Sequence, residues 1–171
     1  MKKIIVITGP ESTAKSTLTN ELSVYFEAAS YQEYAREYLA AKGSRYTWDD
    51  VAEIARVQLR QYYEARNSSE ELVFFDTWLI ITKVWFEWAY KRLPDWLEQA
   101  IDENPVDLYL LCKPDLPWEP DPLREHGGAE REQLFQIYKQ ELINRGFPFV
   151  EIGGLGDERV LNAIKAVKSI L

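Results

Sequence analysis

Short apolar runs alternate with longer amphipathic stretches along this chain. The first run, residues 3–8, is dominated by Ile and Val and ends at Gly9 and Pro10. Such a run is typical of a strand buried on both faces of a parallel sheet. Similar runs lie at residues 71–76, 106–111 and 147–152, and a more polar one lies at residues 29–33. The pattern therefore predicts a parallel sheet of about five strands.

Amphipathic segments between these runs predict helices that cover both faces of the sheet. From Lys15 onward, Leu18, Leu22 and Phe26 form an apolar stripe that can pack on the strands. Thr47 is a candidate N-cap, followed by two Asp residues where the helix dipole favours negative charge. Further helices are expected at residues 48–63, 79–91, 94–100, 130–144 and 157–171. This alternation predicts an α/β fold whose ligands bind at the carboxyl ends of the strands.

The segment that joins the first strand to the first helix matches a phosphate-binding loop. It follows the pattern G-x-x-x-x-G-K-[ST], except that Ala14 replaces the second glycine. In such loops backbone N–H groups and a helix N-terminus converge on phosphate oxygens. Because the match follows a buried strand and opens a helix, we prefer it to a Gly-Pro turn before a capped helix. We therefore expect ATP to be bound by Gly9, Pro10, Glu11, Ser12, Thr13, Ala14, Lys15, Ser16 and Thr17.

Individual residues of this P-loop have separate expected roles. Lys15 should reach the outer phosphates and act in catalysis, and the Ser16 hydroxyl should bind a Mg²⁺ that bridges the β- and γ-phosphates. Thr17 is expected near the α-phosphate. A helical φ would accommodate Ala14 without strain, whereas its methyl group could crowd the β-phosphate and weaken binding. The sequence thus predicts a P-loop kinase fold with ATP and Mg²⁺ as cofactors.

An acidic residue, Asp76, stands at the end of the predicted strand at residues 71–76. A carboxylate there can hold magnesium through water or accept a proton from an attacking hydroxyl. The alternative is an Asp that caps the next helix. A P-loop upstream needs such a carboxylate, so we favour a catalytic and metal-binding role for Asp76.

Composition and charge restrict the partners of the chain. It has 171 residues, 46% of them hydrophobic, and we expect a single domain over residues 1–171. The formal net charge of −8 opposes binding to nucleic acid. No run approaches the ~18 apolar residues of a membrane span, and a signal-peptide pattern is lacking, so we expect a cytoplasmic protein without membrane partners. Single Cys and His residues do not indicate a zinc site. Association into a homo-oligomer stays open.

Taken together, these motifs resemble the ribosylnicotinamide kinase domain of NadR-type P-loop kinases. Residues 8–13 are similar to the family's phosphate loop, and residues 33–38 to its E-x-x-R-x-Y segment. Residues 75–77 and 82–85 resemble its D-T-[DE]…T-x-[KQ] element, and residues 118–124 its W-x-x-D-G-[LI]-R element. The similarity runs nearly end to end and, at this length, implies a stand-alone kinase domain. It implies transfer of the ATP γ-phosphate to the 5′-hydroxyl of nicotinamide riboside, which gives nicotinamide mononucleotide in NAD salvage.

Besides Ala14, two positions depart from the family pattern. Trp78 stands where the family often has an acidic residue, and Pro122 replaces a glycine in the turn before Arg124. The first change alters how the nucleoside is held, and the second stiffens the turn. Both bear on the identity of the substrate more than on the fold.

A charged segment at about residues 113–131 is a candidate lid. Arg124 and Arg131 flank a Gly-Gly pair in it, and two guanidinium groups on a mobile segment can neutralise charge on the transferred phosphoryl group. The alternative is a solvated loop with surface salt bridges. We assign catalytic roles to both arginines.

Residues near the second strand and the lid are candidates for binding a nucleoside. Glu33 and Arg36 follow the second strand, and a carboxylate there can accept from ribose hydroxyls. Tyr34 could stack on the base, although packing within an amphipathic helix is the simpler explanation. Asp121 could contact the ribose or a magnesium-bound water, and Trp118 could line the cleft or pack beneath the lid.

Two alternatives to nicotinamide riboside kinase remain. One is another small-molecule kinase on the same fold, for a deoxynucleoside or a nucleoside monophosphate. The other is a nucleotide-binding regulatory module in which Ala14 has weakened catalysis. The aromatic residues Trp85, Phe86, Trp88 and Tyr90 lie at helical spacings, and we expect them to fill a core or an interface.

Overall fold

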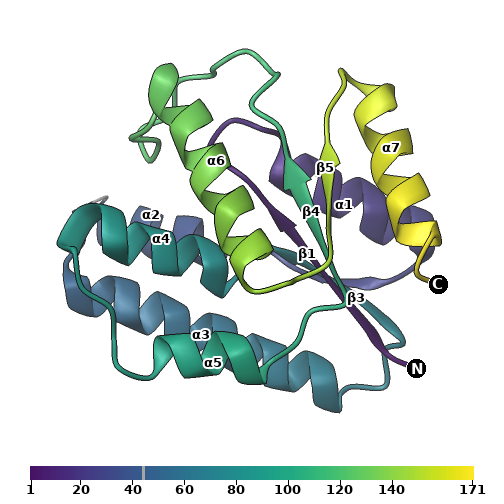
Figure 1. Cartoon of the computed structure of the whole chain (residues 1–171), viewed down its shortest axis with the longest axis horizontal. Coiled ribbons are helices and arrows are strands. Elements are labelled where there is room, and N and C mark those ends of the chain that lie inside the picture. Colours follow the sequence, from purple (N-terminus) through teal and green to yellow (C-terminus); the bar gives the residue numbers. More distant parts are fainter. Residues whose placement is uncertain (44) are drawn as a thin grey trace.

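The computed structural model describes residues 1–43 and 45–171. Within this part of the chain, five parallel strands form one sheet in the order β2-β3-β1-β4-β5 (Figure 1). The strands are β1 (Lys3–Thr8), β2 (Ala29–Tyr31), β3 (Leu72–Asp76), β4 (Leu108–Cys112) and β5 (Phe149–Ile152). The predicted parallel sheet of about five strands is confirmed.

The central strand β1 shows why a continuous apolar run was needed. Ile4 and Val6 point into one hydrophobic cluster, whereas Ile5 and Ile7 point into another. All four side chains are at most 1% exposed. Because both faces of the strand are buried, alternation with polar residues would place polar groups in the core.

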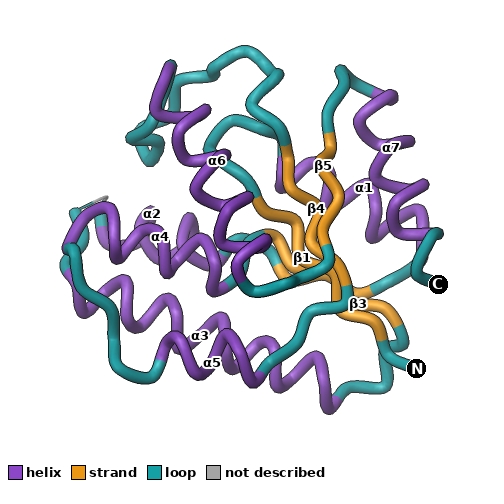
Figure 2. Tube along the Cα trace, in the orientation of Figure 1, coloured by secondary structure: helices purple, strands orange, loops and turns teal. Residues whose placement is uncertain are grey.

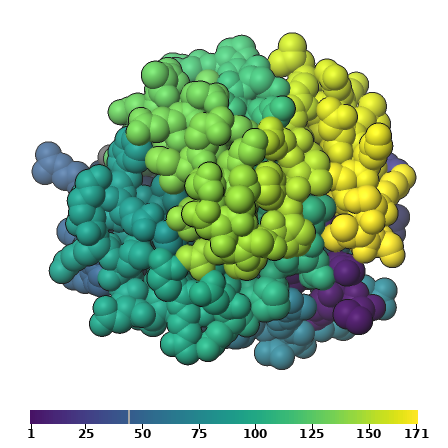
Figure 3. Space-filling view, in the orientation of Figure 1, coloured from purple at the N-terminus to yellow at the C-terminus, as the bar shows by residue number. Residues whose placement is uncertain are grey.

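Helices cover both faces of this sheet (Figure 2). The face of Ile5 and Ile7 is packed by α1 and α7, and the opposite face by α3, α4, α5 and α6. In the space-filling view, side chains of α6 and α7 form much of the face turned to the viewer (Figure 3). The helices are α1 (Lys15–Phe26), α2 (Tyr34–Lys42), α3 (Trp48–Asn67), α4 (Leu79–Tyr90), α5 (Leu97–Glu103), α6 (Ala129–Asn144) and α7 (Asp157–Lys168).

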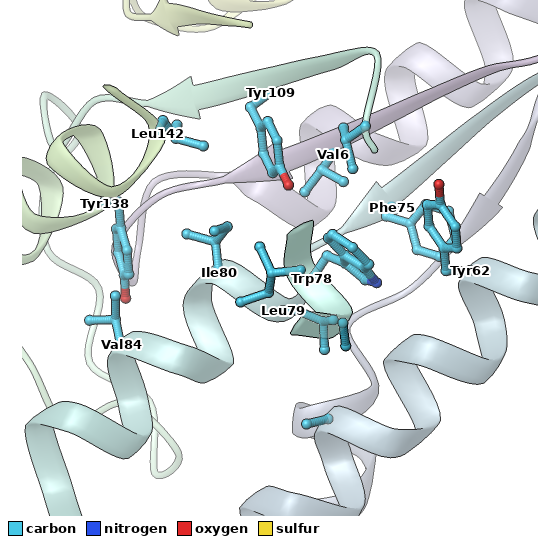
Figure 4. Packing of buried hydrophobic residues seen from close by; sticks show 14 of the residues in the cluster. Val6, Tyr62, Phe75, Trp78, Leu79, Ile80, Val84, Tyr109, Tyr138 and Leu142 are labelled. Carbon is cyan, nitrogen blue, oxygen red and sulfur yellow. The ribbon is translucent and has the colours of Figure 1, made fainter. Parts of the chain in front are cut away.

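The larger hydrophobic cluster joins the strands to α3, α4 and α6. Trp78, which precedes α4, lies between the sheet and α3, and its ring stacks on Tyr62 with the ring centroids 5.1 Å apart (Figure 4). Tyr138 and Leu142 of α6 approach α4 from the other side (Figure 4). Trp78 therefore serves the core, which explains why an acidic residue would not fit at this position.

One helix begins later than the sequence pattern indicated. We expected a helix from Pro94, but the residues after it form a turn in which the Leu97 N–H donates to the Pro94 carbonyl, and α5 begins at Leu97.

Helix α2 follows β2 directly. It is fastened to α3 by Tyr38, whose hydroxyl donates to Asp50 at 2.7 Å. Asp50 also completes a capping box with Thr47, which confirms the predicted N-cap.

No helix in the described part of the chain is long and apolar enough to cross a membrane.

Candidate functional site

The P-loop turns sharply between β1 and α1. Gly9 has a φ of 141°, and a Cβ atom at this position would lie 2.7 Å from the carbonyl oxygen of Cys112 on β4. Only glycine fits such an approach. The Thr13 hydroxyl and the Lys15 ammonium each donate to the Pro10 carbonyl at 2.8 Å. The loop is therefore held in shape by its own side chains, with Lys15 folded over it.

Ala14 does not have the helical φ that we expected. It occupies the N-cap position of α1 with φ 61° and ψ 30°, in the left-handed region. A side chain there costs roughly 1–2 kcal/mol, a cost that the glycine of the usual motif avoids. The expectation that Ala14 fits without strain is wrong, because the turn into α1 requires a left-handed residue.

Asp76 and Ser16 meet where the carboxyl end of β3 faces the start of α1. The Ser16 hydroxyl donates to Oδ2 of Asp76 in a short hydrogen bond. The other oxygen, Oδ1, is buried and has no hydrogen-bond partner in the part of the chain that is described. Burial, reinforced by the charge of Glu33 and offset by Lys15, raises the pKa of Asp76 to about 6. Trp78 takes the N-cap position of α4, so Asp76 is not a helix cap.

This pair of residues suits a magnesium ion. Mg²⁺ prefers oxygen ligands and is usually held by one or two carboxylates together with substrate phosphates. Asp76 offers a buried oxygen without a partner, and Ser16 a hydroxyl beside it. No group of three His, Cys, Asp or Glu residues able to hold a metal occurs among residues 1–43 and 45–171. Most ligands of the ion would therefore come from the nucleotide and water.

A cavity of about 230 Å³ adjoins the P-loop. Glu33 and Arg36 line its wall, with the Glu33 carboxylate 3.7 Å from Nε of Arg36. Arg36 also donates to Asp121 at 2.9 Å. A hydrogen bond from the backbone N–H of Leu123, together with that from Arg36, lowers the pKa of Asp121. Asp121 is not among the lining residues, so it positions Arg36 from outside the cavity.

The structure places Tyr34 and Trp118 away from the cavity wall. The Tyr34 ring packs beside Tyr38, with 6.0 Å between the centroids. Trp118 packs against Gly127 and under the guanidinium of Arg131, 5.8 Å from its ring centroid. Of the alternatives for Trp118, packing beneath the lid segment is the one that the structure has.

The two arginines of the candidate lid lie in different settings. Arg124 lines the cavity. Arg131 lies in the first turn of α6, is 6% exposed, and donates to the carbonyl oxygens of Ser12 and Leu116 at 2.9 and 3.0 Å. Arg131 is therefore tied to the back of the P-loop and does not belong to a solvated loop.

Backbone contacts fasten the lid segment to the P-loop. The Glu11 carboxylate accepts from the backbone N–H groups of Glu125 and His126 at 3.0 and 2.9 Å. The Ser12 hydroxyl donates to the Pro117 carbonyl at 3.3 Å and accepts from the N–H of Glu119 at 3.0 Å. Movement of the segment would therefore also move the P-loop.

Sequence reasoning missed the residues of α4 that line the cavity. Ile81, Trp85 and Trp88 line it, although we expected both tryptophans to be purely structural. Their spacing of i, i+4 and i+7 puts them on one face of α4, a signal that does not reveal what the face contacts. Phe86 of the same helix is fully buried in the core, as expected. Further lining residues that sequence reasoning missed are Leu39, Tyr46, Gln58, Thr82, Val84, Leu134 and Tyr138.

Comparison with known proteins agrees with this geometry. Residues 4–159 match the AAA_28 family model, described as an AAA domain. The trifunctional NAD biosynthesis/regulator protein NadR of Salmonella typhimurium is 27% identical over 175 residues, and that of Escherichia coli is 26% identical. Each alignment covers 99% of this chain and 43% of the relative, so the chain spans less than half the length of these proteins.

Comparison with solved structures also finds similarity to NadR proteins. A NadR protein in complex with NR superimposes with a TM-score of 0.83 at 24% identity, covering 99% of this chain and 50% of that one. A NadR complex with NAD and AMP-PNP gives 0.79 at 26% identity, with coverage of 99% and 49%. Thymidylate kinase from Ehrlichia chaffeensis gives 0.71 at 11% identity, with coverage of 97% and 98%. The resemblance to NadR inferred from the motifs is thus confirmed, and the chain belongs to the AAA_28 family of AAA domains.

Proposed function

We propose that this chain is an ATP- and Mg²⁺-dependent kinase that phosphorylates the 5′-hydroxyl of a nucleoside, with nicotinamide riboside as its preferred acceptor. The observation that carries the proposal is a single cavity of about 230 Å³, lined by the P-loop together with Glu33, Arg36 and aromatic residues of α4. A kinase needs both parts in one cavity, because the acceptor hydroxyl must be held in line with the γ-phosphate.

The P-loop would bind the phosphates of ATP through its backbone N–H groups at the N-terminus of α1. Lys15 now donates to the Pro10 carbonyl, and it would exchange this contact for the outer phosphates. Arg124, on the cavity wall, would stabilise the charge that spreads over the γ-phosphate oxygens in the transition state. Residues 113–131 would act as a lid that excludes water from the reaction.

Asp76 would receive the proton of the attacking hydroxyl. In the ligand-free protein its pKa is about 6, so the carboxylate is mostly ionised at neutral pH and able to accept a proton. Ser16 and Asp76 would also hold Mg²⁺, which when bound neutralises charge on the β- and γ-phosphates. Glu33 would accept from the ribose hydroxyls, with Arg36 fixed beside it by Asp121.

Two observations support nicotinamide riboside as the acceptor. The curated relatives are named for NAD biosynthesis, and a NadR structure contains NR. The pyridinium ring of nicotinamide riboside is cationic and flat. Trp85 and Trp88 line the cavity, and an indole ring favours a cationic ring over a neutral one through cation–π attraction.

Release of ADP from ATP and Mg²⁺ tests the proposal. The acceptors to compare are nicotinamide riboside, cytidine, uridine, deoxynucleosides and nucleoside monophosphates. We expect release with nicotinamide riboside, and its loss in Lys15→Ala. Lys165→Ala, which changes an exposed lysine on α7, is the matched control and should keep full activity.

Other outcomes would redirect the assignment. ADP release only with a deoxynucleoside or a nucleoside monophosphate would contradict the proposed acceptor and support the kinase activity. No ADP release with any acceptor, together with measurable ATP binding, would overturn the kinase proposal and favour a nucleotide-binding regulatory module.

A further inference from the structure

A buried amide lies in the cavity wall, and no role has yet been assigned to it. Gln58 of α3 is 2% exposed and lines the cavity. The Thr82 hydroxyl of α4 donates to its side-chain oxygen Oε1 at 2.6 Å. The indole N–H of Trp78 donates to its backbone carbonyl at 3.3 Å. Both the backbone and the side chain of Gln58 are therefore fixed.

The hydrogen bonding of this amide is incomplete. The nitrogen Nε2 carries two donors, and it points away from Thr82 because Oε1 faces that hydroxyl. Within the described part of the chain, Nε2 has no hydrogen-bond partner. Leu39, Ile81 and Trp85, which line the same cavity, offer no side-chain acceptor. Gln58 lines the cavity, so a donor that no protein group occupies there is available to a bound ligand.

We propose that Gln58 selects the base of the acceptor by donating from Nε2 to an exocyclic oxygen on the ring edge. This inference rests on the proposed kinase function. Trp85 and Trp88 would cover a face of the flat ring, while Gln58 contacts its edge. The class of ligand is a nucleoside whose base carries a carbonyl or carboxamide oxygen, as nicotinamide riboside does. Thr82 is a positioning residue, because it fixes which end of the amide faces the ligand.

Variants of the pair separate recognition from packing. Gln58→Leu removes the donors at similar volume, and we expect the KM for nicotinamide riboside to rise about 10-fold while kcat stays within about 2-fold, because ground and transition states share the contact. Thr82→Val should raise KM by about 3-fold, and Thr82→Ser should restore it. Gln61→Leu, on the same helix but outside the cavity wall, is the matched control and should change neither constant.

A substrate analogue without the carboxamide tests the contact with Gln58 from the ligand side. N-ribosylpyridinium lacks the carboxamide, so the wild-type protein should bind it about 10-fold more weakly than nicotinamide riboside. Gln58→Leu should then leave affinity for this analogue within about 2-fold of the wild type, because the contact is already absent. An equal loss on both nucleosides, or no loss on either, would overturn the assignment to Gln58.

Calorimetric binding of the two nucleosides distinguishes this inference from the kinase proposal. Binding that depends on Gln58 but is followed by no turnover would contradict the kinase and keep the recognition role. Turnover of nicotinamide riboside with a KM that Gln58→Leu does not change would support the kinase proposal and contradict the recognition role of Gln58. Failure of the wild type to bind either nucleoside would overturn both.

Discussion

At the scale of single residues, several strained or unpaired groups lie together at the candidate site. Ser12, Ala14 and Thr77 have positive φ values of 56°, 61° and 65° although none is glycine. Asp76 is buried with one oxygen unpaired in the described structure. Such features reduce stability and persist where function requires them. Their concentration around the ends of β1 and β3 is itself an argument that this region is the site.

Asp76→Asn should stabilise the ligand-free protein while abolishing phosphate transfer. The pKa of Asp76 is about 6 in the folded chain and near 4 when unfolded. The folded state therefore binds more protons between these values, and the free energy of unfolding falls as pH rises from about 4 to 6 and stays lowered above. The variant should gain roughly 1–3 kcal/mol at pH 7 and little at pH 4, measured by urea denaturation. An equal effect at both pH values would contradict this account.

Ala14→Gly should relieve the left-handed strain of the P-loop. The relief of roughly 1–2 kcal/mol is partly offset by the greater entropy of glycine in the unfolded chain, about 0.5–1 kcal/mol. We expect a net gain of about 0.5–1 kcal/mol in unfolding free energy, together with tighter binding of AMP-PNP once the methyl group is gone. Destabilisation by 1 kcal/mol or more would show that φ at this position is not the limiting factor.

At the scale of elements, helix α6 and the lid segment are anchored on the P-loop. Arg131 binds the Ser12 carbonyl from α6, and Glu11 holds the backbone N–H groups of Glu125 and His126. The sequence predicted a helix over residues 130–144 and a role for Arg131, but not that the Arg131 side chain would be buried. That information depends on where α6 packs, which local patterns do not contain.

Arg131→Leu should loosen the P-loop from α6. The carbonyl groups of Ser12 and Leu116 would lose their charged donor, which costs roughly 1.5–3 kcal/mol of unfolding free energy. Affinity for AMP-PNP should fall as well, because Ser12 belongs to the loop. Arg60→Leu, whose side chain on α3 is 62% exposed, is the control and should be nearly neutral. A loss of stability with unchanged nucleotide affinity would confine Arg131 to a packing role.

Most elements could be predicted because each carries its own local signal. The apolar run of residues 3–8 coincides with β1, and Thr47 begins α3 with its capping box. The positions of Trp85 and Trp88 could not be predicted in the same way. Their spacing shows that they share a face of α4, but a cavity or a core beneath that face would produce the same pattern. Gln58 was missed for a similar reason, since its role depends on Thr82 of another helix.

At the scale of the whole molecule, sheet topology creates the site. Strand β3 pairs with β1, so that Ile7 lies opposite Asp76 and the Thr77 N–H donates to the Ile7 carbonyl at 2.9 Å. Motifs that are 60 residues apart, at Ser16 and Asp76, thereby meet. The strand order was not contained in the hydrophobic pattern. It is nevertheless what brings two separate sequence motifs together into one candidate site.

Identification of the product formed from ATP, Mg²⁺ and nicotinamide riboside tests the central claim most directly. Mass spectrometry and ³¹P NMR would show whether the phosphoryl group has moved and to which hydroxyl. We predict nicotinamide mononucleotide phosphorylated at the 5′-position, formed in equal amount to ADP and absent with Lys15→Ala. ADP accompanied by free phosphate and unchanged nucleoside, or no ADP despite bound ATP, would contradict the account.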